Sequence, residues 1–163
     1  LHRKIREAGR LMEGGERESK GLDVPEHIAK YPEGTMFGTL PAFGFYVRHA
    51  EAFTLSNAAV RWEKEDHRPA IIADDVKDLT IDGLRTGAVA GTAPVIWLSD
   101  VAGAFIRGCR PASGKTFLRV SGASSVGVTV MDNDLSATSK PFEFDGAPKA
   151  AVHASGNIRK SAK

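Results

Sequence analysis

Adjacent carboxylates at Asp74 and Asp75 are the residues of this sequence that most resemble a catalytic pair. Two carboxyl groups can share acid–base chemistry, one donating a proton while the other activates a water molecule. Neighbouring residues of an extended strand point to opposite faces, so these two need a bend or a third carboxylate nearby. Asp75 also recurs as Asp100 at a spacing of 25 residues. We therefore interpret Asp75 and Asp100 as corner residues whose side chains accept backbone N–H hydrogen bonds.

Arg48 and His49 form the polar pair that best suits ligand binding. The planar guanidinium of Arg48 can hold a carboxylate through two charge-assisted hydrogen bonds, and His49 can bond a hydroxyl or titrate. Tyr46 would share the face of Arg48 on the same strand and could stack on a sugar ring. Tyr46, Arg48 and His49 are therefore our candidate substrate-binding residues. The alternative, which we favour, pairs Arg48 with Asp74 or Asp75 of the next repeat and places His49 in a turn.

Two other segments resemble functional motifs but fit structural roles better. Asn133 lies within an Asp-Asn-Asp run at the corner of a repeat, where we expect it to cap a turn. Residues 108–116 are similar to a phosphate-binding loop, but Cys109 stands where that loop requires glycine. A strand is expected to follow, whereas phosphate binding needs a helix N-terminus. We therefore expect no nucleotide to bind, and we interpret Cys109 as a small apolar residue within a coil.

The remaining titratable residues predict no metal site and no cofactor. Asp66, His67 and Arg68 lie in a connection between repeats, where a loop can border a groove, but we expect them to be solvated charges. The five histidines are dispersed and lack a ligand spacing such as His-x-x-x-His.

A repeat of about 25 residues must position all of these side chains. Its frame in residues 69–84 is an apolar pair, a polar corner, an apolar–polar–apolar strand and a turn. So regular a repeat predicts the stacked coils of a solenoid, because short coils bury their apolar faces only by stacking. The frame recurs in residues 45–57 and 94–108, with looser copies in 117–133 and 142–156. The turn anchors are spaced 26, 25, 25 and 24 residues apart and are Asn57, Gly83, Gly108, Asn133 and Asn157.

We predict an all-β fold, a parallel β-helix of about five coils over residues 35–158. Apolar residues alternate within each run, so one face of each strand points into a core. Residues 1–34 are expected to form an irregular segment with an amphipathic helix over residues 2–12, and to cover the first coil. Residues 159–163 are expected to be a frayed tail. An antiparallel sandwich of about seven strands is the alternative, but it does not explain the even anchor spacing.

Composition and charge argue against nucleic acid and membranes as binding partners. A chain of 163 residues fits one domain with a real core. The chain has 22 Lys and Arg residues and 20 Asp and Glu residues, so its charges nearly balance. Its basic residues do not gather among aromatic residues as they do in nucleic-acid-binding faces, so we expect no nucleic-acid partner. No apolar run approaches the ~20 residues of a membrane span, so we expect no membrane partner. The sequence contains no signal peptide, although one could precede Leu1.

Residues 31–50 (YPEGTMFGTLPAFGFYVRHA), followed by residues 53–57 and 68–76, resemble the C-terminal half of bacterial glycoside hydrolase family 28. Members of that family are polygalacturonase-like enzymes that degrade pectin. The similarity covers residues 24–158 and is most specific over residues 31–83. It implies a right-handed parallel β-helix, a secreted or periplasmic location, and inverting hydrolysis of glycosidic bonds in pectic or related polysaccharide.

The catalytic motifs of that family are not all present. It uses aspartates of an Asn-x-Asp and an Asp-Asp motif, placed ~6.5–9.5 Å apart, with Gly-His-Gly and Arg-x-Lys motifs in neighbouring coils. The last two motifs do not occur in this sequence, and all four precede the matched region in the family. We therefore expect a C-terminal part of the enzyme domain, without catalytic residues, from a protein that is monomeric at full length. A polysaccharide lyase and a non-catalytic carbohydrate-binding or adhesion module are the alternatives.

Overall fold

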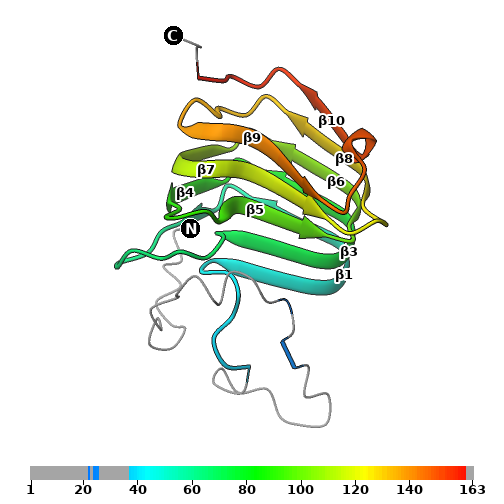
Figure 1. The fold of residues 1–163 in the computed structure, drawn as a ribbon, viewed down its shortest axis with the longest axis horizontal. Coiled ribbons are helices and arrows are strands. Elements are labelled where there is room, and N and C mark those ends of the chain that lie inside the picture. Colours follow the sequence, from blue (N-terminus) through cyan, green and yellow to red (C-terminus); the bar gives the residue numbers. More distant parts are fainter. Residues whose placement is uncertain (1–21, 23, 26–36, 161–163) are drawn as a thin grey trace.

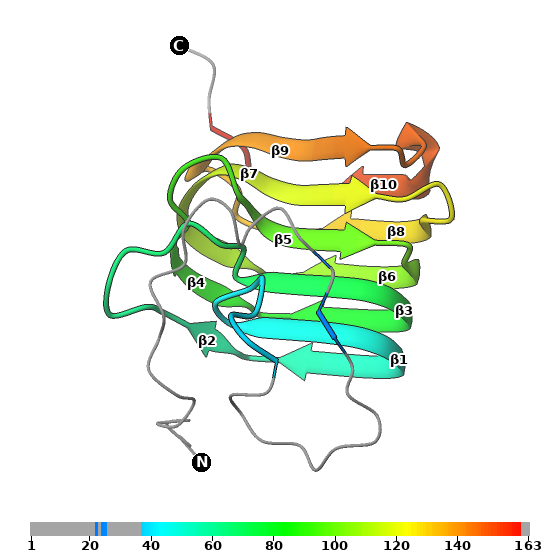
Figure 2. The ribbon, with the colours of Figure 1, turned by 60° about the horizontal axis from the view of Figure 1, so that its bottom comes forward.

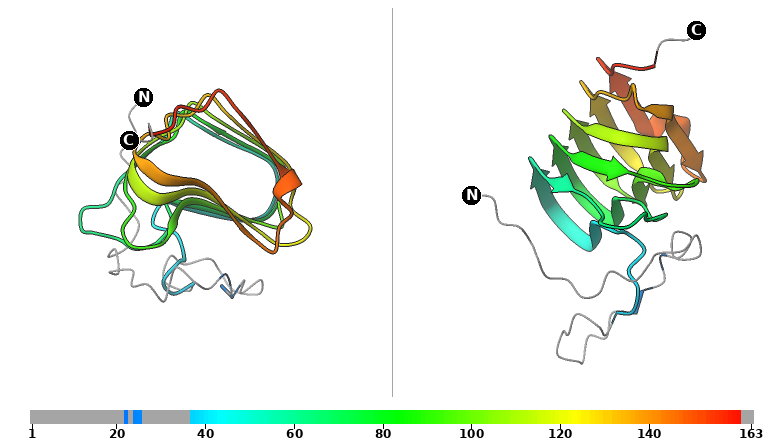
Figure 3. Two further views of the ribbon diagram at one scale, coloured as in Figure 1. Left: turned by 45° about the horizontal axis from the view of Figure 1, so that its top comes forward. Right: turned by 90° about the vertical axis from the view of Figure 1, so that its left-hand side faces the viewer.

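The computed structural model describes residues 22, 24–25 and 37–160, and the chain forms a right-handed parallel β-helix (Figure 1). Viewed close to the coil axis, successive turns superimpose as a flattened tube (Figure 3). The predicted fold class is confirmed, and the antiparallel sandwich is excluded because the strands pair in parallel. The elements are β1 (Phe45–Ser56), β2 (Ala59–Val60), β3 (Ile71–Asp82), β4 (Arg85–Ala88), β5 (Pro94–Ser99), β6 (Ala102–Arg107), β7 (Arg110–Ser121), β8 (Val126–Met131), β9 (Thr138–Asp145), the short 3-10 helix η1 (Lys149–Ala151) and β10 (Val152–Ser155).

The strands form three parallel sheets around the tube. The first sheet contains the N-terminal halves of β1 and β3, then β5, the C-terminal half of β7, and β9. The second contains the C-terminal halves of β1 and β3, then β6, β8 and β10. The third is short and contains β2, β4 and the start of β7. Figure 2 shows the strands stacked from β1 at one end to β9 and β10 at the other.

The register between coils confirms the repeat that the sequence predicts. The run from Phe53 to Leu55 pairs with the run from Leu79 to Ile81, as expected. The first sheet has five rungs in the described residues, so four full turns separate its first and last rungs. One row of that sheet consists of Phe45, Ile71, Ile96, Leu118 and Phe142.

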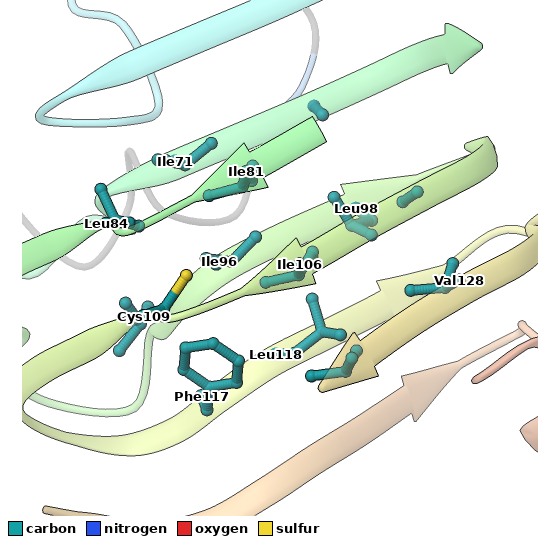
Figure 4. Close-up of a cluster of buried hydrophobic side chains, with 14 of the residues drawn as sticks. Ile71, Ile81, Leu84, Ile96, Leu98, Ile106, Cys109, Phe117, Leu118 and Val128 are labelled. Atoms are coloured by element: carbon teal, nitrogen blue, oxygen red, sulfur yellow. The ribbon is translucent and has the colours of Figure 1, made fainter. Parts of the chain in front are cut away.

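Inward-pointing apolar side chains of successive coils fill the tube (Figure 4). On β3, Leu79 and Ile81 are buried, while Thr80 between them is partly exposed, as expected for alternating faces. Ile96, Ile106 and Phe117 are fully buried in the next coils. Because most inward positions stay apolar from coil to coil, one core runs along the whole stack, and burying it is the main force that stabilises the fold.

Left-handed backbone marks the corner that follows the second sheet in every described coil. The φ angles there lie between 52° and 70°. Our placement of the last two anchors at Asn133 and Asn157 is wrong by one residue, because those asparagines follow the left-handed position and turn inward. The left-handed residues are spaced 26, 25, 24 and 24 apart and are Asn57, Gly83, Gly108, Asp132 and Gly156.

The two ends of the described chain lack regular structure. Residues 37–44 form turns and bends before β1, and residues 159–160 follow β10 without a strand. Leu22 packs against Ile72 and Trp97 on the outer face of the first sheet. The predicted helix over residues 2–12 lies outside the described residues. No helix of the described part is long and apolar enough to cross a membrane.

Candidate functional site

Tyr46 and Arg48 lie together on the outer face of the first coil, as the strand alternation predicts. The Tyr46 hydroxyl donates to the carbonyl oxygen of Leu22 at 3.0 Å. Nη1 of Arg48 donates to the carbonyl oxygen of Val24 at 2.6 Å. Because an earlier segment of the chain is bound across both side chains, part of their hydrogen-bonding capacity is used within the protein.

Arg48 and His49 also contact the acids of the next coil, as the favoured alternative predicted. Nε of Arg48 lies 3.4 Å from Oδ2 of Asp74, and Nδ1 of His49 lies 2.7 Å from Oδ2 of Asp75. His49 lies within strand β1 rather than in a separate turn, at a left-handed corner with a φ of 48°. These contacts support structural roles, and substrate binding by Tyr46, Arg48 and His49 stays a prediction. A shallow hollow at this corner is lined by His49, Ala50, Lys77 and the acids Glu51 and Asp75.

Asp75 and Asp100 occupy the same left-handed corner in adjacent coils, so their predicted corner position is confirmed. Their carboxylates bond in opposite directions along the coil axis. Asp75 meets His49 of the preceding coil, whereas Asp100 accepts a hydrogen bond from the Ser124 hydroxyl of the following coil. Both partners are side chains rather than the backbone N–H groups that we expected. In the candidate acid–base pair, Asp74 is paired with Arg48 and Asp75 with His49, so basic residues of the preceding coil hold both carboxylates.

Asn133 is fully buried and caps the turn, as predicted. Its Oδ1 accepts a hydrogen bond from the N–H of Cys109 at 2.9 Å. Its Nδ2 donates to the carbonyl oxygen of Ile106 at 3.1 Å and to Oδ1 of Asn157 at 2.8 Å. Both polar atoms of the amide are thus satisfied inside the protein, which suits a structural role.

Cys109 lies in the core, as the interpretation of it as a small apolar residue requires. Burial raises the pKa of its thiol to about 11. The thiol is therefore protonated near neutral pH and a poor nucleophile. The segment that follows is strand β7, so the similarity to a phosphate-binding loop has no helix to support it.

Asp66 and Arg68 form a buried ion pair, so our expectation of solvated charges is wrong. Their side chains are each 6% exposed. Nη2 of Arg68 donates to Oδ2 of Asp66 at 2.6 Å, and Nε donates to Oδ1 at 2.9 Å. Nη1 of Arg68 donates to the carbonyl oxygen of Leu40 at 2.8 Å. The pair fastens the loop before β1 to the connection before β3, and its opposite charges compensate each other where both side chains are buried.

A second polar cluster lies on the outer face of the first sheet in the last coils. Arg119 stacks on Trp97, with Cζ 5.3 Å from the ring centroid, and its Nη2 lies 2.9 Å from Oε1 of Glu143. Burial raises the pKa of Glu143, but Arg119, Thr116 and Lys140 outweigh this effect and lower it overall. The cluster places a cation, an aromatic ring and a carboxylate in one row across three coils.

The third sheet carries a row of arginines that our sequence reasoning missed. Arg85 and Arg110 pair directly in adjacent coils, and Arg61 lies just beyond β2. The spacing of 25 residues between Arg85 and Arg110 equals the repeat and could have revealed them. Nothing marked the third sheet beforehand, because β2 has only two residues. A depression of about 420 Å³ is lined by Arg61, Arg85, Thr86, Arg110, Pro111, Ala112, Asp134, Ser136 and Ala137.

Among the described residues, no group of three or more His, Cys, Asp or Glu side chains is placed to hold a metal ion.

Comparisons with known proteins assign no family to this chain. A scan against protein-family models and searches of curated proteins and solved structures found no match to this chain.

Proposed function

We propose that this chain is the C-terminal β-helix portion of a polygalacturonase-like glycoside hydrolase, and that it binds pectic polysaccharide without cleaving it. The catalytic aspartates of such an enzyme would lie outside this chain, which would be secreted or periplasmic. The parallel β-helix agrees with the fold that the resemblance implies. Residues 45–57 and 71–76, which carry part of that resemblance, form the first two rungs of the helix.

The ion pairing of the acidic side chains is the observation that best supports the non-catalytic role. Inverting hydrolysis needs two carboxyl groups on opposite sides of one glycosidic bond, with room for a water molecule. In the described coils, four of the outward-facing acids are instead paired with basic residues of a neighbouring coil. These pairs are Asp74 with Arg48, Asp82 with Arg107, Asp134 with Arg110 and Glu143 with Arg119.

A non-catalytic carbohydrate-binding or adhesion module is the second candidate. The arginine row on the third sheet favours it, because a charged depression on a regular solenoid serves binding without any enzyme being attached. The two candidates differ in what precedes the chain. A polygalacturonase-like protein would carry Asn-x-Asp, Asp-Asp, Gly-His-Gly and Arg-x-Lys motifs in that order before Leu1, and a binding module would not.

The full chain can be tested with polygalacturonate by two measurements on one sample. Equilibrium binding reports the interaction, and release of reducing ends reports cleavage. We expect saturable binding with no release above a protein-free control. Release of reducing ends would refute the non-catalytic role, and absence of binding would refute the proposed class of polysaccharide.

A further inference from the structure

Arg85 differs from every other arginine on the described strands in its ionic contacts. Each of the other four has an acidic partner one coil away: Arg48, Arg107, Arg110 and Arg119. Arg85 is exposed and has no acid within ion-pair distance in the described part of the chain. Its row neighbours are Ala59 on one side and Arg110 on the other.

The pairing of Arg85 with Arg110 places two like charges on adjacent rungs. Rungs of a parallel sheet are ~4.8 Å apart, and like charges that are direct neighbours across strands destabilise a sheet. Nε of Arg110 is 3.1 Å from Oδ2 of Asp134, so this guanidinium is held in place in the row. The hydroxyl and the backbone N–H of Ser136, together with Arg110, lower the pKa of Asp134, which therefore stays ionised. An anion placed between the two guanidinium groups would remove the repulsion.

Arg61 adds a third guanidinium at the edge of the same depression. The next residue, Trp62, donates from its indole nitrogen to the carbonyl oxygen of Ala88 at 2.5 Å, which ties this segment to β4. The indole lies beside Gly87, where an added Cβ would be 3.6 Å from the indole nitrogen, an ordinary packing distance. Three guanidinium groups and one carboxylate line the depression, so its charge favours anions.

We propose that Arg61, Arg85 and Arg110 form a binding site for the carboxylates of a uronate polysaccharide chain on the third sheet. The planar fork of a guanidinium matches a carboxylate through two parallel hydrogen bonds. Successive arginines along the coil axis suit a ligand that repeats its charge along one direction. The choice of a polysaccharide rests on the proposed function, whereas the preference for carboxylates rests on the arginines alone.

Single-stranded nucleic acid fits this surface less well. Proteins that bind such strands stack successive bases on aromatic side chains within a basic groove. The residues that line the depression include no aromatic residue, and Asp134 stands among them. Small residues such as Ala112 and Pro111 instead leave a shallow floor between the arginines.

The test compares Arg85→Gln with Arg107→Gln in the full chain by calorimetric titration with galacturonate oligosaccharides. Both substitutions remove one exposed positive charge, but Arg107 lies on the second sheet and is paired with Asp82. We expect Arg85→Gln to weaken binding roughly tenfold, as loss of a charged hydrogen bond does, and Arg107→Gln to change it little. Arg85→Gln also removes a like-charge contact, so its unfolding midpoint should not fall, and weaker binding cannot then reflect unfolding.

Each other result overturns the proposal in a recognisable way. Equal weakening by both variants would indicate non-specific attraction of an anion to a basic protein. If the wild-type chain binds tightly and Arg85→Gln has no effect, the arginines are not the binding site, but the proposed function is not contradicted. If the wild-type chain binds single-stranded DNA or heparin but no galacturonate, the ligand class is wrong and the proposed function falls with it.

Discussion

Asn133 and Asn157 lie one coil apart, and their side-chain amides are hydrogen-bonded at 2.8 Å. Oδ1 of Asn157 also accepts the backbone N–H of Asn133 at 3.1 Å, so each asparagine caps the turn of the coil before it. This ladder runs inside the tube, where water cannot replace a lost partner. It fixes the corner that follows the second sheet in the last two coils.

Replacing Asn133 by alanine should therefore destabilise the protein strongly. The N–H of Cys109 and the carbonyl of Ile106 would lose their side-chain partners inside the core. At 1–3 kcal/mol for each buried unsatisfied group, we expect a loss of about 3 kcal/mol in the free energy of unfolding, measured by urea denaturation. The matched variant Asn157→Ala, at the half-buried end of the ladder, should cost less. An equal cost at both positions would contradict a buried ladder.

Removing one member of the buried Asp66–Arg68 ion pair should lower the free energy of unfolding more than removing both. Arg68→Met leaves the buried carboxylate of Asp66 without its partner, for which we expect a loss of about 3–5 kcal/mol. The double variant Asp66→Leu/Arg68→Met should recover much of this loss, because no uncompensated charge remains. A double-mutant cycle measured by chemical denaturation checks the coupling. Additive effects of the two substitutions would show that the pair is not coupled.

Glu143 makes the stability of the protein depend on acid pH. Its pKa in the folded protein lies below its ordinary value of 4.5, because Arg119, Thr116 and Lys140 outweigh burial. The carboxylate therefore stabilises the fold fully above pH 4.5, and this contribution is lost as the pH falls through the lower folded-state pKa. We expect Glu143→Gln to lower the melting temperature at neutral pH and to reduce its acid dependence.

The control for that experiment is Glu63→Gln, an exposed glutamate outside the strands. At each pH between neutral and 4, the melting curve of Glu63→Gln should almost match that of the parent protein. If Glu143→Gln and the parent protein lose stability in parallel as the pH falls, Glu143 does not carry the predicted effect.

The outer face of the first sheet should become accessible when Leu22 is made polar. Leu22 packs against Ile72 and Trp97, and Trp97 is 7% exposed. We expect Leu22→Asp to increase acrylamide quenching of Trp97 fluorescence, measured in a Trp62→Phe background so that one tryptophan reports. The control is Leu40→Asp, because Leu40 is already 38% exposed and should change quenching little. Unchanged quenching in Leu22→Asp would show that Leu22 does not shield Trp97 from solvent.

The repeat made much of the fold predictable, because each coil must place its apolar residues on the same inward rows. The pairing of the Phe53 run with the Leu79 run followed from matching residues one repeat apart. The anchors in the last two coils were displaced by one residue because asparagine is itself a common left-handed residue, so the pattern predicts corners at Asn133 and Asn157. Only the register distinguishes Asp132, which has a φ of 53°, from Asn133, which is buried.

The side-chain contacts could be predicted only where they follow the repeat. Arg48 and Asp74 are one repeat apart on an exposed face, so their pairing was foreseeable. The burial of Asp66 and Arg68 depends on the carbonyl of Leu40, which belongs to a non-repeating loop. Arg85 was missed for a different reason. The third sheet is too short to show an alternating pattern, and only the spacing of 25 residues between Arg85 and Arg110 indicated that they are neighbours.

Recognition of pectic carboxylates by this β-helix, as proposed, can be tested by comparing the affinity of the wild-type chain for polygalacturonate with its affinity for the fully methyl-esterified polymer. The two polymers share a backbone and differ in charge, so the ratio of affinities isolates carboxylate recognition. We predict clear binding of the acid form, weakened by added salt, and little binding of the ester. Equal affinity for the two polymers, or no binding of either, would contradict the proposal.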